Sequence, residues 1–115
     1  MNETLLTKDA EYLFCVLYRE YKDRRANGIN KATAKFFGGS EDIYNSFFAE
    51  WNVEDIDETC RELDRCGFIT CNYADDMAQD LFIEDKGIVY MENRFKNTTK
   101  ELIDAISKLR SLLFG

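Results

Sequence analysis

The chain has 115 residues and a formal net charge of −7, with 45% hydrophobic and 32% charged residues. This length suits one domain, and this balance is that of a globular protein and excludes a disordered chain. No apolar run approaches the ~20 residues of a membrane-spanning helix, and the first residues lack the basic and apolar stretches of a secretory signal. We therefore expect a cytoplasmic protein that does not associate with a membrane and whose four cysteines are reduced thiols.

The first predicted helix begins after Thr7 and ends at Asn27-Gly28. Thr7 is a typical N-cap residue, and Asp9 suits the positive end of the helix dipole. Apolar side chains then recur at helical spacing for roughly five turns. Gly28 can adopt the left-handed conformation that ends a helix.

Between the first helix and Trp51 the sequence predicts two short helices, separated by Gly38-Gly39. Ser40 is the expected N-cap of the second, whose apolar residues repeat at i, i+4 and i+7. Either segment 31–37 or segment 40–50 can serve as the second main helix of the domain, and the sequence leaves that choice open.

A further helix is predicted from Asn52 to Cys66-Gly67. Asn52 is the expected N-cap, and Asp55 takes the position of the acidic partner in a partial capping box. Residues 68–73 are rich in β-branched and aromatic side chains and predict a strand. A second strand is predicted at 81–83, after an acidic segment that forms a long hairpin tip.

Two helices are predicted to complete the chain. Residues 86–92 turn back into helix, and Thr98 with Glu101 predicts a capping box at the start of the last one. Apolar residues of this last helix recur at i, i+4, i+7 and i+11, and they are Leu102, Ile106, Leu109 and Leu113. The stripe either packs on its own domain or dimerises with a copy of itself. The predicted fold class is mainly α with a small antiparallel β-hairpin.

The stretch from Val53 to Ile69 resembles the winged helix-turn-helix pattern, in which an amphipathic helix ends in Leu-x-x-x-Gly-aromatic-Ile and runs into a wing. The stretch from Leu81 to Glu92 is similar to the exit from such a wing, with Glu84 where threonine is more usual. The resemblance covers roughly residues 8–95. Small winged-helix proteins of bacterial and phage genomes, with no assigned role, are similar as well.

The resemblance implies a winged-helix domain over residues 1–96 and a C-terminal packing or dimerisation helix over 97–115 of the same domain. The last helix looks similar to those of MarR-type and PadR-type regulators, in which terminal helices commonly make the dimer. A homodimer is therefore one expectation. Such short patterns specify a fold far better than a function.

Acidic residues dominate the segment that a winged helix normally turns toward DNA. That fold most often places its third helix in the major groove, but residues 40–85 contain 14 acidic and two basic side chains. Phosphates would repel this segment, at a cost on the order of 1 kcal/mol for each close contact in water. The acids either keep the surface soluble or dock a protein partner. The candidate docking residues are Trp51, Glu54, Asp55, Glu58 and Glu62.

The alternative function is that of a DNA-binding transcriptional regulator with a basic N-terminal face. Residues 1–39 contain seven bases and five acids. The candidate nucleic-acid contacts are Arg19, Lys22, Arg24, Arg25, Lys31 and Lys35. For Arg24-Arg25 the sequence favours a simpler interpretation, because bases at the end of a helix complement its dipole.

No catalytic or cofactor-binding constellation can be recognised. The sequence lacks histidine and a phosphate-binding glycine loop. Cys60, Cys66 and Cys71 are six and five residues apart, which is not the spacing of a zinc or redox site. Cys15 and Cys60 fall on apolar helix faces and predict buried thiols. We therefore expect a non-enzymatic regulatory protein, without metal or cofactor, that binds a macromolecule. The favoured mode is docking of a protein through the acidic third helix and the wing.

Overall fold

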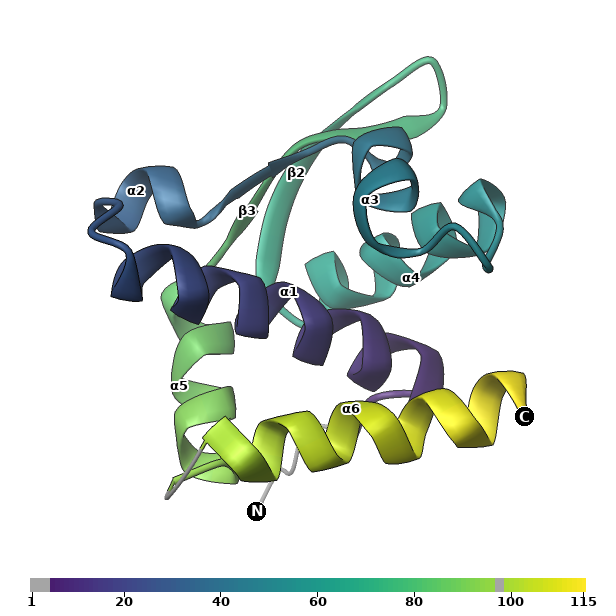
Figure 1. The fold of residues 1–115 in the computed structure, drawn as a ribbon. Coiled ribbons are helices and arrows are strands. Elements are labelled where there is room, and N and C mark those ends of the chain that lie inside the picture. Colours follow the sequence, from purple (N-terminus) through teal and green to yellow (C-terminus); the bar gives the residue numbers. More distant parts are fainter. Residues whose placement is uncertain (1–4, 97–98) are drawn as a thin grey trace.

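The computed structural model describes residues 5–96 and 99–115. Helices make up most of this part of the chain, and three antiparallel strands form a small sheet (Figure 1). The elements are α1 (Lys8–Ala26), α2 (Lys31–Ala34), β1 (Phe36–Gly38), α3 (Ser40–Phe47), α4 (Val53–Arg65), β2 (Ile69–Ala74), β3 (Met77–Ile83), α5 (Asp85–Arg94) and α6 (Thr99–Phe114). The mainly helical class with a small antiparallel hairpin is confirmed. In the described ranges no helix is long and apolar enough to cross a membrane.

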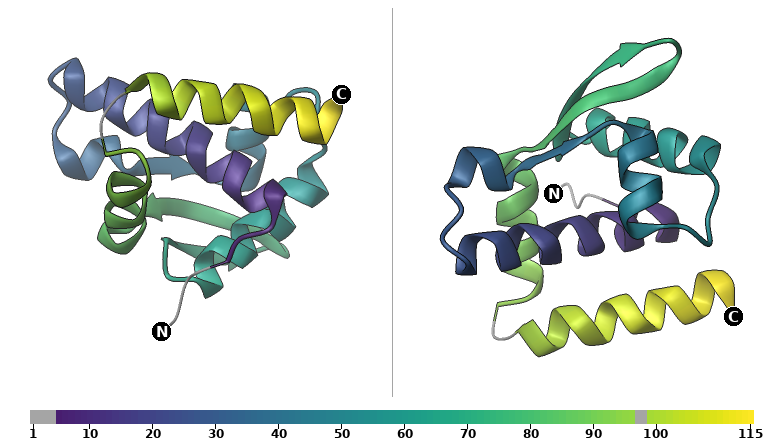
Figure 2. Two further views of the ribbon diagram at one scale, coloured as in Figure 1. Left: turned by 90° about the horizontal axis from the view of Figure 1, so that it is seen from below. Right: turned by 45° about the horizontal axis from the view of Figure 1, so that its top comes forward.

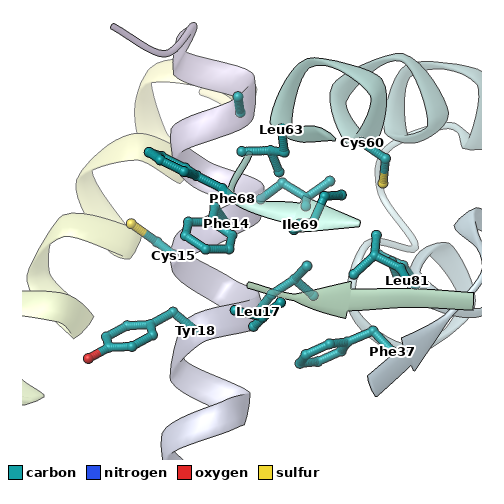
Figure 3. Close-up of a cluster of buried hydrophobic side chains, with 14 of the residues drawn as sticks. Phe14, Cys15, Leu17, Tyr18, Phe37, Cys60, Leu63, Phe68, Ile69 and Leu81 are labelled. Carbon is teal, nitrogen blue, oxygen red and sulfur yellow. The ribbon is translucent and has the colours of Figure 1, made fainter. Parts of the chain in front are cut away.

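Helix α1 is the central element of the fold and contacts α2, α4, α5 and α6. It begins as predicted, because the Thr7 side chain accepts a hydrogen bond from the Ala10 N–H at 3.1 Å. Phe14 and Leu17 of α1 are fully buried. Figure 3 shows them in one cluster with Phe68, the residue before β2. Burying each such side chain contributes roughly 1.5–3 kcal/mol, so α1 organises the core.

The segment between α1 and α4 contains two short helices, as predicted, and also a strand that the sequence pattern does not predict. Strand β1 is only three residues long, too short to show an alternating pattern, and Phe36 pairs with Phe82 of β3. The N-cap of α3 is Gly39, not Ser40. The Gly39 N–H donates to Asp42 at 2.9 Å, which leaves the Ser40 hydroxyl for another partner.

The structure also decides which segment is the longer second helix. Helix α3 has eight residues and packs on α4, whereas α2 has four residues and packs on α1. Of the two predicted segments, 40–50 therefore supplies the helix that precedes α4, although α3 ends at Phe47.

The hairpin of β2 and β3 is tighter than the sequence predicts. The sequence predicts a long tip for its acidic segment, but Ala74 pairs directly with Met77. The turn is therefore only Asp75-Asp76, with φ of 54° and 63°. Two successive left-handed residues are typical of a type I′ turn, and aspartate tolerates that conformation better than most residues. Strand β3 consequently starts at Met77, four residues earlier than expected.

Strand β3 is the middle strand, in the order β1-β3-β2. The register with β2 shifts between Thr70 and Asn72, which is a β-bulge, and Asp80 adopts a φ of 52° opposite it. The hairpin extends beyond the helices (Figure 1).

Helices α5 and α6 close the fold. Helix α5 follows β3 directly, as predicted, and α6 lies alongside α1 in both views of Figure 2. Leu102 and Leu109 of α6 are buried, and Ile106 and Leu113 are partly buried against the core. The predicted capping box involves Thr98, which lies outside the described residues.

Candidate docking surface

The solvent-facing side of α4 is acidic near its N-terminus. Asn52 caps the helix by accepting a hydrogen bond from the Asp55 N–H at 2.9 Å. The side chains of Glu54, Asp55 and Glu58 are exposed. Within the described part of the chain, none of these three carboxylates forms an ion pair. We call these three residues the α4 acidic face.

Asp57 does not belong to this surface, although the sequence counts it among the acids of the helix. It is 6% exposed, and its Oδ1 accepts hydrogen bonds from Ser40 Oγ at 2.8 Å and from the Ala78 N–H at 2.6 Å. Its Oδ2 accepts from Arg61 Nε at 2.9 Å. Burial alone would raise the pKa of the carboxyl, but these hydrogen bonds outweigh burial and hold the pKa below its ordinary value. Asp57 therefore joins α3, α4 and β3.

Arg61 is occupied by the same network. Its Nη2 donates to the Asp76 carbonyl at 2.9 Å, and its guanidinium lies 4.4 Å from the centre of the Tyr73 ring. The Tyr73 hydroxyl donates in turn to Asp64 at 2.7 Å. These contacts fix the hairpin to α4. Of the two bases on this helix, Arg65 is the exposed one.

The sequence does not single out this network, although it holds one signal. Asp57 and Arg61 are four residues apart, a spacing that allows an ion pair on a helix. Asp57 also follows Ile56, which lies on the buried face. What the sequence cannot show is that Ser40 and the Ala78 amide converge on the same carboxylate.

Two of the candidate docking residues also have internal partners. Trp51 is partly buried, with ring centres 5.5 Å from Phe48, 6.0 Å from Tyr12 and 5.6 Å from Phe114. These tilted and edge-to-face contacts join α1 to the C-terminal ends of α3 and α6.

Glu62 also has an internal partner. Its carboxylate accepts hydrogen bonds from the Thr7 N–H at 2.9 Å and from Thr7 Oγ1 at 2.8 Å. It thus ties the start of α1 to α4. The structure brings Glu54, Asp55 and Glu58 together at the surface and assigns internal contacts to Trp51 and Glu62.

Arg24 is the most engaged of the predicted basic contacts. Its Nε bonds Glu20 at 3.0 Å, and its Nη1 donates to the carbonyls of Ala34 and Phe36. Its guanidinium also lies over the Phe37 ring at 4.4 Å. Arg24 thus holds α2 and β1 against α1, which is a structural use of the charge.

The other N-terminal bases are mostly paired. Lys31 and Lys35 share the Asp85 carboxylate at 3.3 and 2.7 Å, and these ammonium groups lower the pKa of Asp85. Arg25 donates to the Ile29 carbonyl, in the turn after α1. Lys22 Nζ lies 5.8 Å from the centre of the Tyr18 ring. Arg19 is exposed. These bases are spread over α1, α2 and the residue that ends α2, and several of them make contacts within the chain.

The thiols lie as the sequence predicts. Cys15 and Cys60 are buried, and desolvation raises the pKa of each to about 12. Over residues 5–96 and 99–115, no group of three or more metal-ligating side chains is placed to hold an ion.

Comparison of the chain with protein-family models, curated proteins and solved structures finds no match.

Proposed function

We propose that this chain is a non-enzymatic winged-helix regulatory protein that docks a basic protein partner through α4 and the hairpin. The order of elements supports the fold assignment. In that fold, α3 and α4 correspond to the helix-turn-helix, β1 is the short strand between α1 and α3, and the β2–β3 hairpin is the wing.

The observation that carries the proposal is the combination of exposed acids and an occupied base on α4. Glu54, Asp55 and Glu58 are exposed, while Arg61 is held by Asp57 and the hairpin. A DNA-reading helix needs bases that can neutralise phosphates. This helix offers carboxylates where those bases would be needed, and the hairpin turn adds Asp75-Asp76.

A partner with a basic surface suits this face. Exposed ion pairs contribute only about 0.2–1 kcal/mol each, so the α4 acidic face mainly speeds and orients the encounter. The rigid link between α4 and the hairpin presents both sets of carboxylates in one fixed arrangement, which reduces the entropy lost on binding.

The test compares two triple charge reversals. The first replaces Glu54, Asp55 and Glu58 with lysine, and the matched control replaces Asp23, Glu92 and Asp104, which are exposed acids on α1, α5 and α6. We expect the first variant to lose a partner recovered with the natural chain and the control to keep it. Equal recovery by both variants would contradict the proposal.

Binding to random duplex DNA tests the alternative. We expect no binding even at low salt. Micromolar affinity that falls steeply as salt is raised would instead establish a DNA-binding protein and overturn docking by the acidic face.

A further inference from the structure

Strand β2 is an open edge of the sheet. The order β1-β3-β2 gives it one strand neighbour, and the backbone hydrogen bonds found for residues 69–74 all run to β3. Natural proteins usually protect such an edge with proline, lysine or a covering segment. The β2 sequence, Ile-Thr-Cys-Asn-Tyr-Ala, contains neither proline nor a charged residue. Its outer edge therefore offers main-chain donors and acceptors to an additional strand.

Two carboxylates lie beside β2, each held by a neutral β2 side chain. Asp80 comes from the middle strand β3, and Glu84 is the residue that follows this strand. Thr70 Oγ1 donates to Glu84 Oε2 at 2.8 Å, and Asn72 Nδ2 donates to Asp80 Oδ2 at 3.2 Å. Alternate residues of a strand point to the same face, so these two pairs share the outer face of the sheet.

The third carboxylate lies on the opposite face. The Tyr73 hydroxyl donates to Asp64 Oδ2 at 2.7 Å, and Tyr73 is 43% exposed. An aromatic ring beside a carboxylate suits a guanidinium group, and Arg61 already lies 4.4 Å from the centre of this ring. The outer face, with Glu84 and Asp80, is therefore the face that favours added positive charge.

We propose that β2 is the docking edge for an extended basic segment of the partner, which adds to the sheet as a fourth strand. The inference rests on the proposed function and names how the basic partner binds. Main-chain hydrogen bonds to β2 supply affinity in this mode, and alternate side chains supply specificity. Lysine or arginine at every second position would point toward the outer face, where their long side chains can reach Glu84 and Asp80, and the intervening residues would lie on the face of Tyr73.

A second copy of the chain does not suit this edge. Antiparallel pairing of β2 with its copy would join two sheets that both carry Asp80 and Glu84 on the outer face, with no basic side chain on β2 to offset them. Charge of the same sign on both partners disfavours association. The anchored carboxylates thus disfavour self-association and select a basic strand.

The direct test is a nuclear magnetic resonance titration of the full chain with a capped seven-residue peptide that alternates lysine with threonine. We expect the largest amide shifts in β2. Two further peptides carry N-methyl groups on all threonines or on all lysines. Alternate amides of a strand point to opposite edges, so only one of these two peptides loses the N–H groups that face β2. That peptide should bind at least about tenfold more weakly than the first peptide, because each lost hydrogen bond is worth roughly 1 kcal/mol. Equal binding by all three peptides would overturn the added strand, as would no binding of the first.

Matched chain variants separate this proposal from the general one. The edge variant combines Asp64→Asn, Asp80→Asn and Glu84→Gln, which keep an acceptor oxygen for each β2 side chain. The control combines Glu54→Gln, Asp55→Asn and Glu58→Gln on α4. We expect the edge variant to weaken the alternating peptide about tenfold at low salt and the control to change it less than the edge variant does. The reverse ranking would overturn the edge while leaving docking by the α4 acidic face intact.

Discussion

Asp57 and Arg61 lie one turn apart on α4, with Arg61 Nε 2.9 Å from Asp57 Oδ2, and together they connect this helix to the hairpin. Asp57 accepts a hydrogen bond from the Ala78 N–H at the start of β3, and Arg61 donates to the Asp76 carbonyl in the turn. The hairpin is therefore attached to α4 at two neighbouring points close to its turn. These contacts hold the acidic turn in a fixed position relative to α4.

Asp57→Asn tests the importance of this link. The substitution keeps the shape of the side chain but removes the charge that accepts from Arg61 and Ser40. Because it leaves a buried network partly unsatisfied, we expect the free energy of unfolding at pH 7 to fall by about 2–4 kcal/mol. Urea unfolding measures this, with Glu58→Gln as the control, since Glu58 is on the same helix but exposed.

The same pair of chains gives a pH dependence. The folded-state pKa of Asp57 lies below the ordinary value of 3.8, so its stabilising effect is fully present above that value. It is lost as the pH falls through the depressed folded-state pKa. The stability difference between the natural chain and Asp57→Asn should therefore stay constant from pH 7 to 5 and narrow only at more acid pH. A difference that shrinks between pH 7 and 5 would contradict the assignment.

The hairpin turn provides a second prediction. Asp75 and Asp76 both have positive φ, a conformation that glycine adopts without steric cost. Replacing the pair with Asn-Gly, the preferred type I′ sequence, should stabilise the fold by about 0.5–1 kcal/mol. Replacing it with Asn-Asn removes the same two charges without adding glycine. If thermal unfolding gives both variants the same midpoint, the gain comes from charge and the turn assignment is wrong.

Much of the fold can be predicted from the sequence because its signals are local. Thr7 and Asn52 mark where α1 and α4 begin, and Gly28 and Gly67 mark where they end. Strand β1 cannot be predicted in this way, because three residues are stabilised by pairing with distant β3 and not by their own pattern. The tight hairpin turn cannot be predicted for a related reason, since acidic residues suggest a loop although they can occupy a tight turn.

The site was predictable to a similar extent. Exposure of Glu54, Asp55 and Glu58 follows from helical periodicity once Ile56 and Cys60 are placed in the core. The roles of Asp57 and Glu62 do not follow from it, because their partners are contributed by elements that are remote in sequence.

Gly87 offers a third prediction, in which helix propensity and packing have opposite effects on the free energy of unfolding of a Gly87→Ala variant. A Cβ at this position would lie 2.5 Å from Phe14 Cζ and 2.8 Å from the Phe68 carbonyl oxygen. Gly→Ala in an exposed helix stabilises by up to about 1 kcal/mol, but here we expect destabilisation by about 1–3 kcal/mol from overpacking. Val89→Ala is the control on the same helix, because Val89 is 52% exposed. A more stable Gly87→Ala chain in urea unfolding would show that α5 lies farther from α1.

Helix α6 gives a fourth prediction, based on two leucines with opposite environments. Leu102 is 1% exposed and packs in the core, whereas Leu112 is 62% exposed. Leu102→Ala should destabilise by about 2–4 kcal/mol through lost burial and the cavity that remains, and Leu112→Ala by less than about 0.5 kcal/mol. Chemical denaturation distinguishes them. Equal effects would mean that α6 does not pack on α1 through this stripe.

The cysteines give a fifth prediction, which probes the core without any substitution. Cys66 and Cys71 are partly exposed, whereas Cys15 and Cys60 are buried with pKa values raised to about 12 by desolvation. Thiolate is the reactive form, so iodoacetamide at pH 8 should modify Cys66 in the folded chain, Cys71 more slowly because burial also raises the pKa of its thiol, and all four cysteines in denaturant. Peptide mass spectrometry identifies the modified positions.

The labelling rate of Cys60 in that experiment reports on the contact between α4 and the sheet. Its side chain lies between α4 and the sheet, near Leu81 (Figure 3), so its labelling requires α4 to separate from β3. Asp57 spans the same boundary through the Ala78 amide. If Asp57 joins the two elements as described, Asp57→Asn should speed the labelling of Cys60 and leave that of Cys15, on the α1 side of the core, much less changed. Equal acceleration at both thiols would instead indicate that the variant opens the whole domain, and that Asp57 acts on global stability without a specific link between α4 and the hairpin.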